Sequence, residues 1–463
     1  MKHSMIQLDD LPDEILIMIF KNMCQADTVY SLIGVNQRFN TIVYDSIFTN
    51  HLTLFEHSSD GSICSFTDSM LEIFCSKILP KINHKIKYLH LESSSMERIL
   101  LATNYPSLYG LCLYNINLET AKHYFFTLST LLELHVSVTN FSDCLYLLDG
   151  RFNQLHTFYV NIAYTRFSRL TINNTENLPN LKVFSLSCKT VTFDFDELIV
   201  PLLHRMINLE ELGLFVKVRK KNTFVDDNDL KKNIINKMSR LNNFQFDIRS
   251  TIHIFNQINL PFNKDIQYIF KDFHNNLIIS YVDYFSETQQ AHCRTYSYPY
   301  LWNSYCEITN NFPSGLLFKY VLKISLHDER PFEHEFFLRI AQSFPLVKYL
   351  TLANNKPQND KQNDDNKNLP IIKYPHLTAL YLIVAHIDYI EQFLLHTKTH
   401  LSNNVDLFVV YHAIEKVTEN FTRNTTRINC EKLNFLGIHG IYKIPQYVKE
   451  YFPNTEILNC EFE

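Results

Sequence analysis

Five segments of this chain share one arrangement, in which a proline stands just before a short apolar run. In four of the five, further apolar residues follow three and five residues after the first apolar residue of that run. Proline ends a helix and pushes the residue before it into extended geometry, so each segment marks a turn from helix into strand. The five dipeptides are Tyr105-Pro106, Leu178-Pro179, Phe344-Pro345, Tyr374-Pro375 and Phe452-Pro453.

The same strand pattern recurs without the proline at eight further places. They begin at Ile86, Leu131, Leu155, Leu209, Leu241, Val321, Val405 and Leu433. Counted together with the proline-marked strands, successive starts fall 22 to 32 residues apart from Ile86 to Leu241 and 26 to 30 residues apart from Val321 onward, which is a period typical of repeat proteins. Segments with helical spacing, such as 230–241, lie between the strands. One such unit cannot bury its apolar face alone, so the pattern predicts stacked units with parallel strands inside and helices outside.

These strands and spacings resemble a leucine-rich-repeat domain over residues 83–463. The resemblance implies an α/β fold, a solenoid (horseshoe) of parallel strands and outer helices. The Asn or Cys eight residues after the first leucine is mostly missing and only Asn355 fits, which predicts an irregular array. Residues 247–320 contain no clean repeat, although 276–282 fit a strand and one or two degenerate repeats are expected there. The polar tract 354–368 is predicted to be a mobile loop.

The first fifty residues carry a second, shorter pattern. Pro12 suits the first position of a helix, and Asp13 and Glu14 fall in its first turn, where the helix dipole favours anions. An apolar stripe follows, and two more apolar segments surround Leu32 and Phe39. The pattern predicts a three-helix unit, which is too small to hold much core and gains from a partner or a following domain.

The same residues resemble an F-box, through Leu11-Pro12-Asp13-Glu14-Ile15-Leu16, the pair Ile19-Phe20 and the closing Asn36-Gln37-Arg38-Phe39. The family usually closes on Trp after Cys, so Phe39 and Asn36 depart from its pattern. The resemblance implies a small helical F-box domain over 5–52, followed by a helical linker over 53–82. It also implies docking on the Skp adaptor of a cullin-RING ubiquitin ligase, through Leu11, Pro12, Ile15, Leu16, Ile19, Phe20, Leu32, Val35 and Phe39.

Composition argues against several functional classes. The chain has 43 basic and 48 acidic residues, a net charge of −5, which argues against nucleic acid as a partner. Acidic residues interrupt any N-terminal secretory signal, and no run of apolar residues is long enough for a membrane span. The 10 cysteines are scattered without a Cys-x-x-Cys pair. We therefore expect a cytoplasmic or nuclear protein with reduced thiols and no membrane partner.

No catalytic motif stands out. The chain has no Gly-rich phosphate loop, G-x-S-x-G or H-E-x-x-H sequence. His327 and His334 frame an acidic segment, which we interpret as a strand-to-helix turn rather than a metal site. We therefore expect no catalytic residue, no cofactor and no metal.

Side chains alternate across a strand, so the residue between the second and third leucine of each repeat should face the concave surface. The row so predicted is His90, Cys112, His135, Tyr159, Ser185, Gly213, Gln245, Ser325, Thr351, Tyr381, Val409 and Gly437. Aromatic side chains with a polar tip are frequent anchors of interfaces. The predicted substrate-binding residues are His90, Tyr114, His135, Tyr159, Phe215, Tyr381, Tyr411 and His439.

The two resemblances together imply a non-catalytic substrate receptor of a Skp-cullin-F-box ubiquitin ligase. The F-box would dock on the Skp adaptor, and the repeat domain would hold a substrate protein for ubiquitination. The alternative is a leucine-rich-repeat scaffold whose F-box-like helices only cap the solenoid. The two differ in exposure, because a receptor leaves part of the N-terminal apolar stripe open and a cap buries it.

Overall fold

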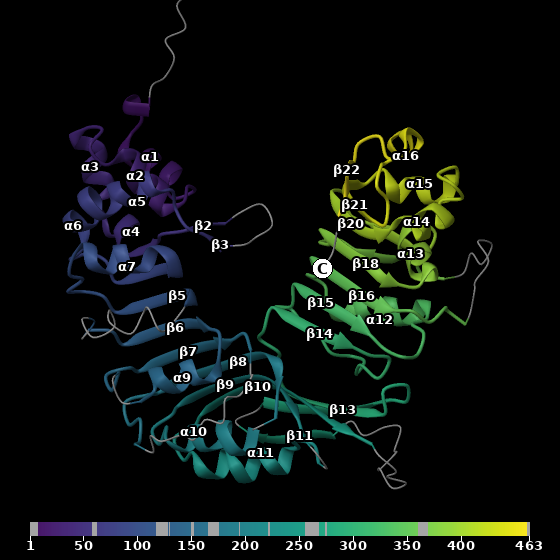
Figure 1. Cartoon of the computed structure of the whole chain (residues 1–463), viewed down its shortest axis with the longest axis horizontal. Helices are drawn as coiled ribbons and strands as arrows, with labels where there is room; N and C mark the ends of the chain where they lie inside the picture. The colour runs from purple at the N-terminus through teal and green to yellow at the C-terminus, as the bar shows by residue number, and fades with distance from the viewer. Residues whose placement is uncertain are drawn as a thin grey trace, which may run out of the picture. The chain divides into compact units, whose positions relative to one another are not determined.

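The chain is described by a computed structural model that covers residues 8–57, 63–116, 128, 130–149, 152–164, 176–193, 195–220, 223–254, 268–273, 276–359 and 369–460. It divides into two compact units (Figure 1). Unit 1 comprises residues up to 219 together with 225–248, and unit 2 comprises 220–224 together with 249 onward. The polar tract predicted at 354–368 is described only up to residue 359; the rest of it lies outside the described residues.

Unit 1 begins with a group of short helices. A 3₁₀ turn, η1 (Leu8–Asp10), leads into α1 (Asp13–Phe20), α2 (Gln25–Leu32), α3 (Gln37–Val43) and α4 (Ser46–Thr49). Helix α1 begins directly after Pro12, with Asp13 and Glu14 in its first turn, so the predicted start of this helix is confirmed. Short helices of this length are stable only when they pack together.

The segment predicted to be a helical linker is helical only in its second half. Strands β1 (His51–Thr53), β2 (Glu56–His57) and β3 (Ile63–Cys64) come first, followed by α5 (Asp68–Ile73), the π-helical η2 (Phe74–Ile78) and α6 (Leu79–Ile82). Strand β1 pairs in parallel with β4 (Tyr88–Glu92). The main sheet of unit 1 therefore begins inside the segment assigned to the F-box, which the sequence pattern did not reveal.

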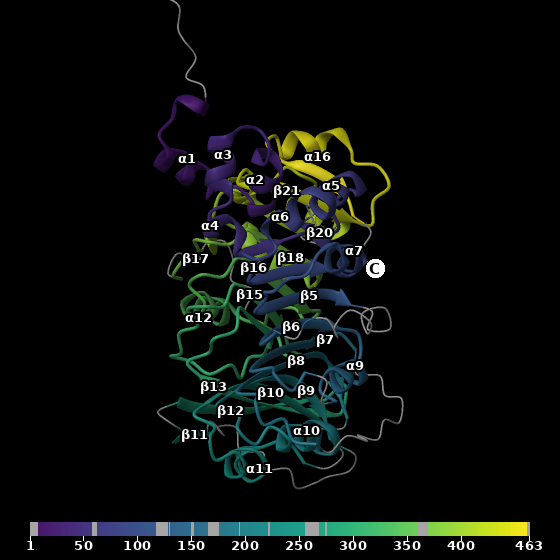
Figure 2. The same ribbon diagram turned by 90° about the vertical axis from the view of Figure 1, so that its left-hand side faces the viewer.

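The sheet of unit 1 runs in the order β1, β4, β5, β6, β7, β8, β9, β10, so strands follow one another in chain order (Figures 1 and 2). Neighbours from β1 to β9 pair in parallel. The remaining strands are β5 (Gly110–Ile116), β6 (Glu133–Val138), β7 (Thr157–Ile162), β8 (Val183–Thr192), β9 (Glu211–Arg219) and β10 (Asn243–His253). Between them lie α7 (Ser93–Ala102), α9 (Phe141–Leu147), η4 (Phe195–Ile199), α10 (Val200–His204), α11 (Asp227–Asn233) and η5 (Ile235–Lys237).

Each predicted proline junction is a tight turn that leads into a strand. The predicted helix before the turn is wrong at Tyr374-Pro375, where the short strand β17 (Ile372–Tyr374) precedes the proline. The backbone N–H of Leu108 donates to the carbonyl of Tyr105 at 3.2 Å, and Val347 donates to Phe344 at 3.3 Å. Proline therefore occupies the second position of a four-residue turn, where its fixed φ is favourable. Strand β5 begins at Gly110, four residues after Pro106. A strand follows each of the predicted starts, whereas β1 (His51–Thr53) and the parallel strand Ser304–Ile308 had no predicted start.

Unit 2 contains an antiparallel insertion where degenerate parallel repeats were expected. The residues of β10 from 249 onward belong to unit 2. Beside β10, the eleven-stranded sheet ends with three strands in the order β13, β12, β11. Strands β11 (Tyr268–Phe273), β12 (Asn276–Phe285) and β13 (Gln290–Tyr298) pair antiparallel. The strand predicted at 276–282 is present. Residues 268–298 are therefore not a degenerate repeat, because the short turn between β12 and β13 permits only a hairpin. Within the same region, however, β14 (Ser304–Ile308) does pair in parallel with the strand that begins at Lys323.

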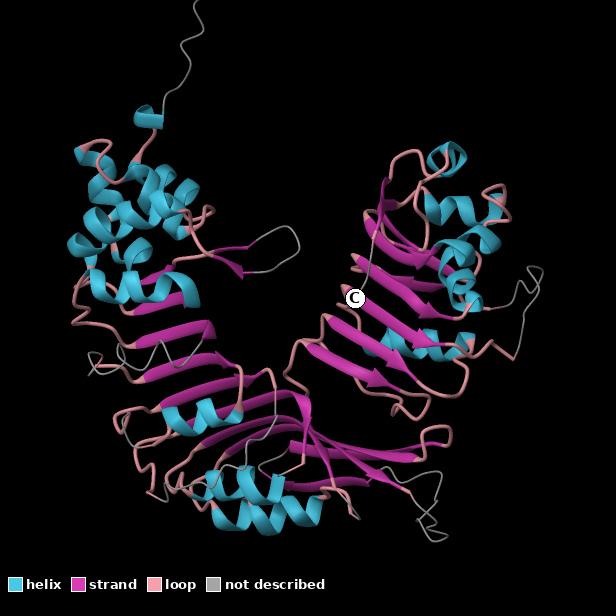
Figure 3. Ribbon diagram, in the orientation of Figure 1, coloured by secondary structure: helices cyan, strands magenta, loops and turns pink. Residues whose placement is uncertain are grey.

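A second, seven-stranded sheet forms the rest of unit 2, so the parallel strands fall into two sheets rather than one. Its order is β14, β15, β16, β18, β20, β21, β22, and all its pairs are parallel. Helices lie along one side of these strands (Figure 3). The strands are β14 (Ser304–Ile308), β15 (Lys323–His327), β16 (Tyr349–Asn354), β18 (Ala379–Ala385), β20 (Val405–Val410), β21 (Leu433–His439) and β22 (Glu456–Asn459), with a separate pair β17 (Ile372–Tyr374) and β19 (Thr399–Leu401). The helices are α12 (His334–Ser343), α13 (Ile387–Leu394), α14 (Tyr411–Val417), α15 (Asn424–Cys430) and α16 (Gln446–Tyr451).

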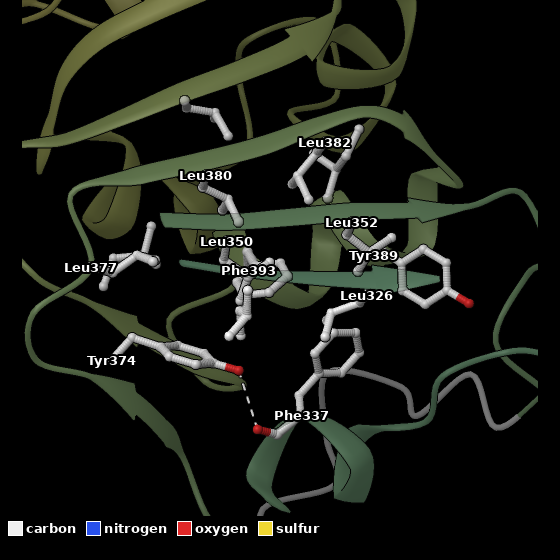
Figure 4. Close-up of a cluster of buried hydrophobic side chains, with 14 of the residues drawn as sticks. Leu326, Phe337, Leu350, Leu352, Tyr374, Leu377, Leu380, Leu382, Tyr389 and Phe393 are labelled. Atoms are coloured by element: carbon white, nitrogen blue, oxygen red, sulfur yellow. Dashed lines mark hydrogen bonds between the residues drawn. The ribbon is translucent and has the colours of Figure 1, made fainter. Parts of the chain in front are cut away.

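The core of unit 2 lies between the strands and these helices (Figure 4). Leucines at alternate strand positions, such as Leu350 and Leu380, pack against aromatic side chains of the helices. The buried Tyr374 hydroxyl donates to the carbonyl of Phe337 at 3.2 Å, so its polar tip is satisfied. Among the residues that the structure describes, no helix has both the length and the apolar character that crossing a membrane requires.

Candidate protein-binding surfaces

The interior of the N-terminal helical group contains four of the predicted adaptor-binding residues. Leu16, Phe20, Leu32 and Phe39 are buried. The rings of Phe20 and Phe39 meet edge to face with centroids 6.0 Å apart. These four side chains pack α1, α2 and α3 together. Phe39 therefore fills the place of the Trp that usually closes the family's pattern.

Polar contacts fix the entry into α3. The Asn36 side chain caps this helix, because its Oδ1 accepts from the Phe39 N–H at 2.7 Å. Arg38 joins α3 to α1 through an ion pair with Asp13 at 2.7 Å and a hydrogen bond to the Leu11 carbonyl. Asn36, which departs from the family pattern, thus has a structural role that the sequence pattern alone did not suggest.

An apolar stripe stays open on α1. Ile15, Met18 and Ile19 are 42%, 63% and 38% exposed, and they lie three and four residues apart, on one face of the helix. Pro12 is exposed beside the stripe and Leu11 is half-buried. Val35, between α2 and α3, is also exposed. Sequence analysis missed Met18, although its spacing from Ile15 was the available signal.

The open face of the unit 1 sheet carries the row of residues predicted from alternation. Strand register aligns His90, Cys112, His135, Tyr159, Ser185 and Gly213 across β4 to β9. Their neighbours in the strands, such as Leu89 and Leu134, are buried on the helix side. Tyr114 and Phe215, also predicted to bind substrate, are half-buried on the same face.

Histidine and tyrosine rings stack along this face. His135 and Tyr159 lie with centroids 4.3 Å apart and planes 24° apart, and His51 stacks on Tyr88 at 4.3 Å. Burial lowers the pKa of His90, and the nearby His135 and His51 lower it further. Burial and the Glu133 carboxylate raise the pKa of Cys112 to about 12, so this thiol stays protonated and is no nucleophile at neutral pH.

The open face of the second sheet also carries an aligned row of residues. Register aligns Ser325, Thr351, Tyr381, Phe408, Gly437 and Leu458. Tyr381 and Phe408 stack with centroids 4.5 Å apart and planes 3° apart. A Cβ at Gly437 would lie 2.6 Å from the Phe408 ring, so glycine is what lets this ring lie flat on its neighbour strand.

Two predicted residues of this sheet are placed differently from expectation. Val409 is buried together with Val405 and Leu407, so alternation along β20 puts Phe408 in the row instead. Tyr411 lies at the start of α14 rather than on the strand, and its hydroxyl contacts Glu415 at 2.9 Å and Tyr447 at 3.0 Å. His439 remains half-buried on β21, with its Nδ1 3.2 Å from the Cys460 carbonyl oxygen.

The segment between His327 and Glu335 is a strand-to-helix turn, as interpreted from the sequence. His334 is buried against Gln392, with ring nitrogen and amide oxygen 3.3 Å apart, and its other nitrogen lies 3.0 Å from the Pro370 carbonyl oxygen. Asp328 accepts from the Asn310 backbone N–H at 2.8 Å. Within the described part of the chain, no three His, Cys, Asp or Glu side chains come together as metal ligands would.

Comparison with known proteins bears on the N-terminal helices. The model of the F-box domain matches residues 8–51, the range that contains η1, α1 to α4 and the first residue of β1. No curated protein matches the chain. With a buried aromatic core, an open apolar stripe on α1 and a matching family model, residues 8–51 are an F-box domain.

Proposed function

We propose that this chain is the substrate-recognition subunit of a Skp-cullin-F-box ubiquitin ligase. The F-box domain binds the Skp adaptor, and the parallel-stranded domain behind it, which we take to be an irregular leucine-rich-repeat solenoid, binds a substrate protein. The chain itself contributes no catalytic group. It acts by holding substrate lysines near the ubiquitin-charged enzyme, which raises the effective concentration of the reactants.

The exposure of the stripe on α1 is the observation that carries this proposal. Fully burying a large apolar side chain contributes roughly 1.5–3 kcal/mol, and a partner that covers the exposed part of these three side chains gains about half of that for each, whereas leaving them in water has no structural benefit for an isolated domain. Leu16 and Phe20, which follow Ile15 and Ile19 in the sequence, are the residues of α1 that are buried in the core of the domain. Ile15, Met18 and Ile19 are therefore available to a partner.

The alternative is a repeat scaffold whose F-box domain only caps the array. Such a cap should bury its whole apolar stripe. Strand β1 does join the sheet through β4, and Leu52 is buried there, so the domain packs on the array through its last helices and β1. The domain packs on the sheet through β1, whereas the exposed apolar stripe lies on α1. This difference favours the receptor over the cap.

Co-purification with the Skp adaptor tests the proposal. Ile15→Asp/Ile19→Asp should abolish adaptor binding, because two carboxylates then face an apolar partner surface. Both positions are exposed, so circular dichroism spectra and the melting temperature should match wild type. Leu101→Asp on α7, at a residue that is 63% exposed, is the matched control and should bind normally.

Either of two results would count against the receptor. Wild type that is folded but does not co-purify with the adaptor would favour the capping scaffold. Equal adaptor binding by wild type and the double variant would mean that the stripe on α1 is not the docking surface.

A further inference from the structure

The open face of the second sheet carries an apolar patch that crosses five of its strands, from β16 to β22. Tyr349, Val384 and Leu458 are 38%, 55% and 48% exposed, and the other members are half-buried. The described helices pack on the leucine side of the strands (Figure 3), so none of them covers this face. Strand register places the members of this aromatic patch in neighbouring rows, and they are Tyr349, Tyr381, Val384, Phe408, Phe435 and Leu458.

The aromatic patch is rigid because its rings support one another. The Tyr381 ring stacks on Phe408, and the centroids of the Phe408 and Phe435 rings lie 5.6 Å apart. The missing side chain of Gly437 leaves the room that the Phe408 ring occupies. Rings held in this way lose little rotational freedom when a partner covers them. A contiguous exposed apolar patch is typical of a protein-binding surface.

The dimensions of the aromatic patch fit a helix better than an extended segment. The row from Lys323 to Glu456 crosses six strands, a span of about 24 Å because neighbouring strands lie roughly 4.8 Å apart. A helix of about 16 residues has this length, and its apolar stripe covers two rows of side chains at once. An extended segment presents its side chains to a surface in single file. It also cannot pair with a sheet face, because the backbone groups of each strand already bond to neighbouring strands.

Opposite charges mark the two ends of this row. Lys323 is exposed on β15, with its Nζ 5.0 Å from the centroid of the Tyr349 ring. Glu456 is exposed on β22, at the other end. Between them, Asp406 is half-buried and accepts from the Asn434 side-chain amide at 3.1 Å. A helix that crosses the strands is therefore best placed with its N-terminus, which carries partial positive charge, at Glu456 and its C-terminus at Lys323.

We propose that the aromatic patch binds an amphipathic helix of the substrate protein. The helix lies across the strands from β22 to β15, with its apolar residues at positions i, i+3, i+4 and i+7 against the rings. This inference rests on the proposed function, since it names the class of substrate segment that unit 2 receives.

Peptide selection on the full-length chain tests the inference. The probe is a phage-displayed library of alanine-rich helical peptides of about 16 residues, in which the positions of one helix face are randomised. A matched library carries prolines at two central positions of the opposite face, so its members cannot form the helix. The helical library should yield binders with apolar residues on the randomised face. Adding the two prolines to a selected peptide should raise its dissociation constant, measured by fluorescence anisotropy, about tenfold or more.

Variants of the chain connect this binding to the aromatic patch. Tyr349→Asp/Leu458→Asp should weaken binding of the selected peptide about tenfold or more, because two carboxylates then face its apolar stripe. Lys323→Glu should weaken binding about threefold, because it places a negative charge at the helix C-terminus. The control is Ile428→Asp on α15, at a residue that is 46% exposed, and it should bind as wild type does. Circular dichroism and the melting temperature of each variant show that it is folded.

The outcomes separate this inference from the proposed function. Equal affinity of the proline peptides, an unchanged affinity in Tyr349→Asp/Leu458→Asp, or no selected peptide at all would each overturn the helix site. Self-association of wild type that the same double variant abolishes, seen by size-exclusion chromatography, would assign the aromatic patch to a second copy of the chain instead. Adaptor co-purification depends on α1 and would be unchanged in all these cases. A chain that binds the helical peptide but not the adaptor would keep this inference and lose the ligase role.

Discussion

Asp283 on β12 is an acid whose burial has an energetic cost at neutral pH. It is 5% exposed and accepts a hydrogen bond from the Thr309 Oγ at 2.8 Å. Burial raises the pKa of this carboxyl to about 6, and the nearby charge of Asp328 adds to the rise. Because the folded state binds this proton more tightly than the unfolded chain, the group stabilises the fold in acid, and that stability is lost as pH rises through about 6.

Asp283→Asn should therefore stabilise unit 2 at neutral pH. The amide oxygen can still accept from Thr309, and no charge is buried. We expect a gain of about 1–2 kcal/mol in the free energy of unfolding at pH 8 and no gain near pH 4, measured by urea denaturation at both values. Glu450→Gln, at an exposed carboxylate, should change neither value. Equal effects of Asp283→Asn at pH 4 and pH 8 would contradict the assignment.

Helix α7 depends on a cap from the strand before it. Glu92, the last residue of β4, accepts from the backbone N–H groups of Ser94 and Ser95 at 2.8 and 2.6 Å. Burial alone would raise the pKa of this carboxyl, but the hydrogen bonds from Ser94 and Ser95 outweigh burial and lower it. The cap is therefore present at neutral pH and is lost as pH falls through the lowered pKa.

Glu92→Ala should destabilise the protein by about 1–2 kcal/mol at pH 7, because two N–H groups at the helix start lose their acceptor. The loss is measured by urea denaturation followed by circular dichroism, and it should shrink in strong acid, where the wild-type carboxyl is also protonated. Glu450→Ala, within α16, is the matched control. Identical stability of Glu92→Ala and wild type at pH 7 would show that water replaces the cap.

The F-box domain and the sheet of unit 1 belong to the same compact unit and share contacts. His51, Leu52 and Thr53 of β1 pair with Tyr88, Leu89 and His90 of β4. The ring of Tyr30 on α2 also stacks on Phe74 with centroids 6.0 Å apart. Removing the N-terminal domain would thus leave β4 as an unprotected edge strand and uncover part of the core.

Deleting residues 1–53 should lower the melting temperature and cause association, seen by thermal denaturation and size-exclusion chromatography. Ile15→Asp/Ile19→Asp, which leaves β1 in place, should melt as wild type and remain monodisperse if wild type is. A truncated chain with wild-type stability would mean that β1 contributes nothing to the sheet. Point variants are therefore the better test of adaptor binding.

Local signals in the sequence identified most strands and the start of α1. The Phe344-Pro345 turn and the alternation that puts His90 and Tyr159 on one face act over a few residues, so neighbours along the chain suffice to predict them. The F-box resemblance likewise rests on a short motif, and the matching family model at residues 8–51 confirms it.

Tertiary structure decided what depends on residues far apart in the chain. The helical spacing of the apolar residues on α1 could not predict that Phe20 is buried while Ile19 is exposed, because the ring that packs against Phe20 comes from α3. The buried asparagine at the end of β16 is Asn354 and not the predicted Asn355, and its amide donates to the Arg330 carbonyl, at 2.8 Å, in the turn that follows β15. The sequence by itself determined the periodic strands and the N-terminal helix start, which are short-range properties. Only the folded structure determined the separation into two sheets and the antiparallel insertion, because each requires the spatial pairing of strands that the sequence keeps apart.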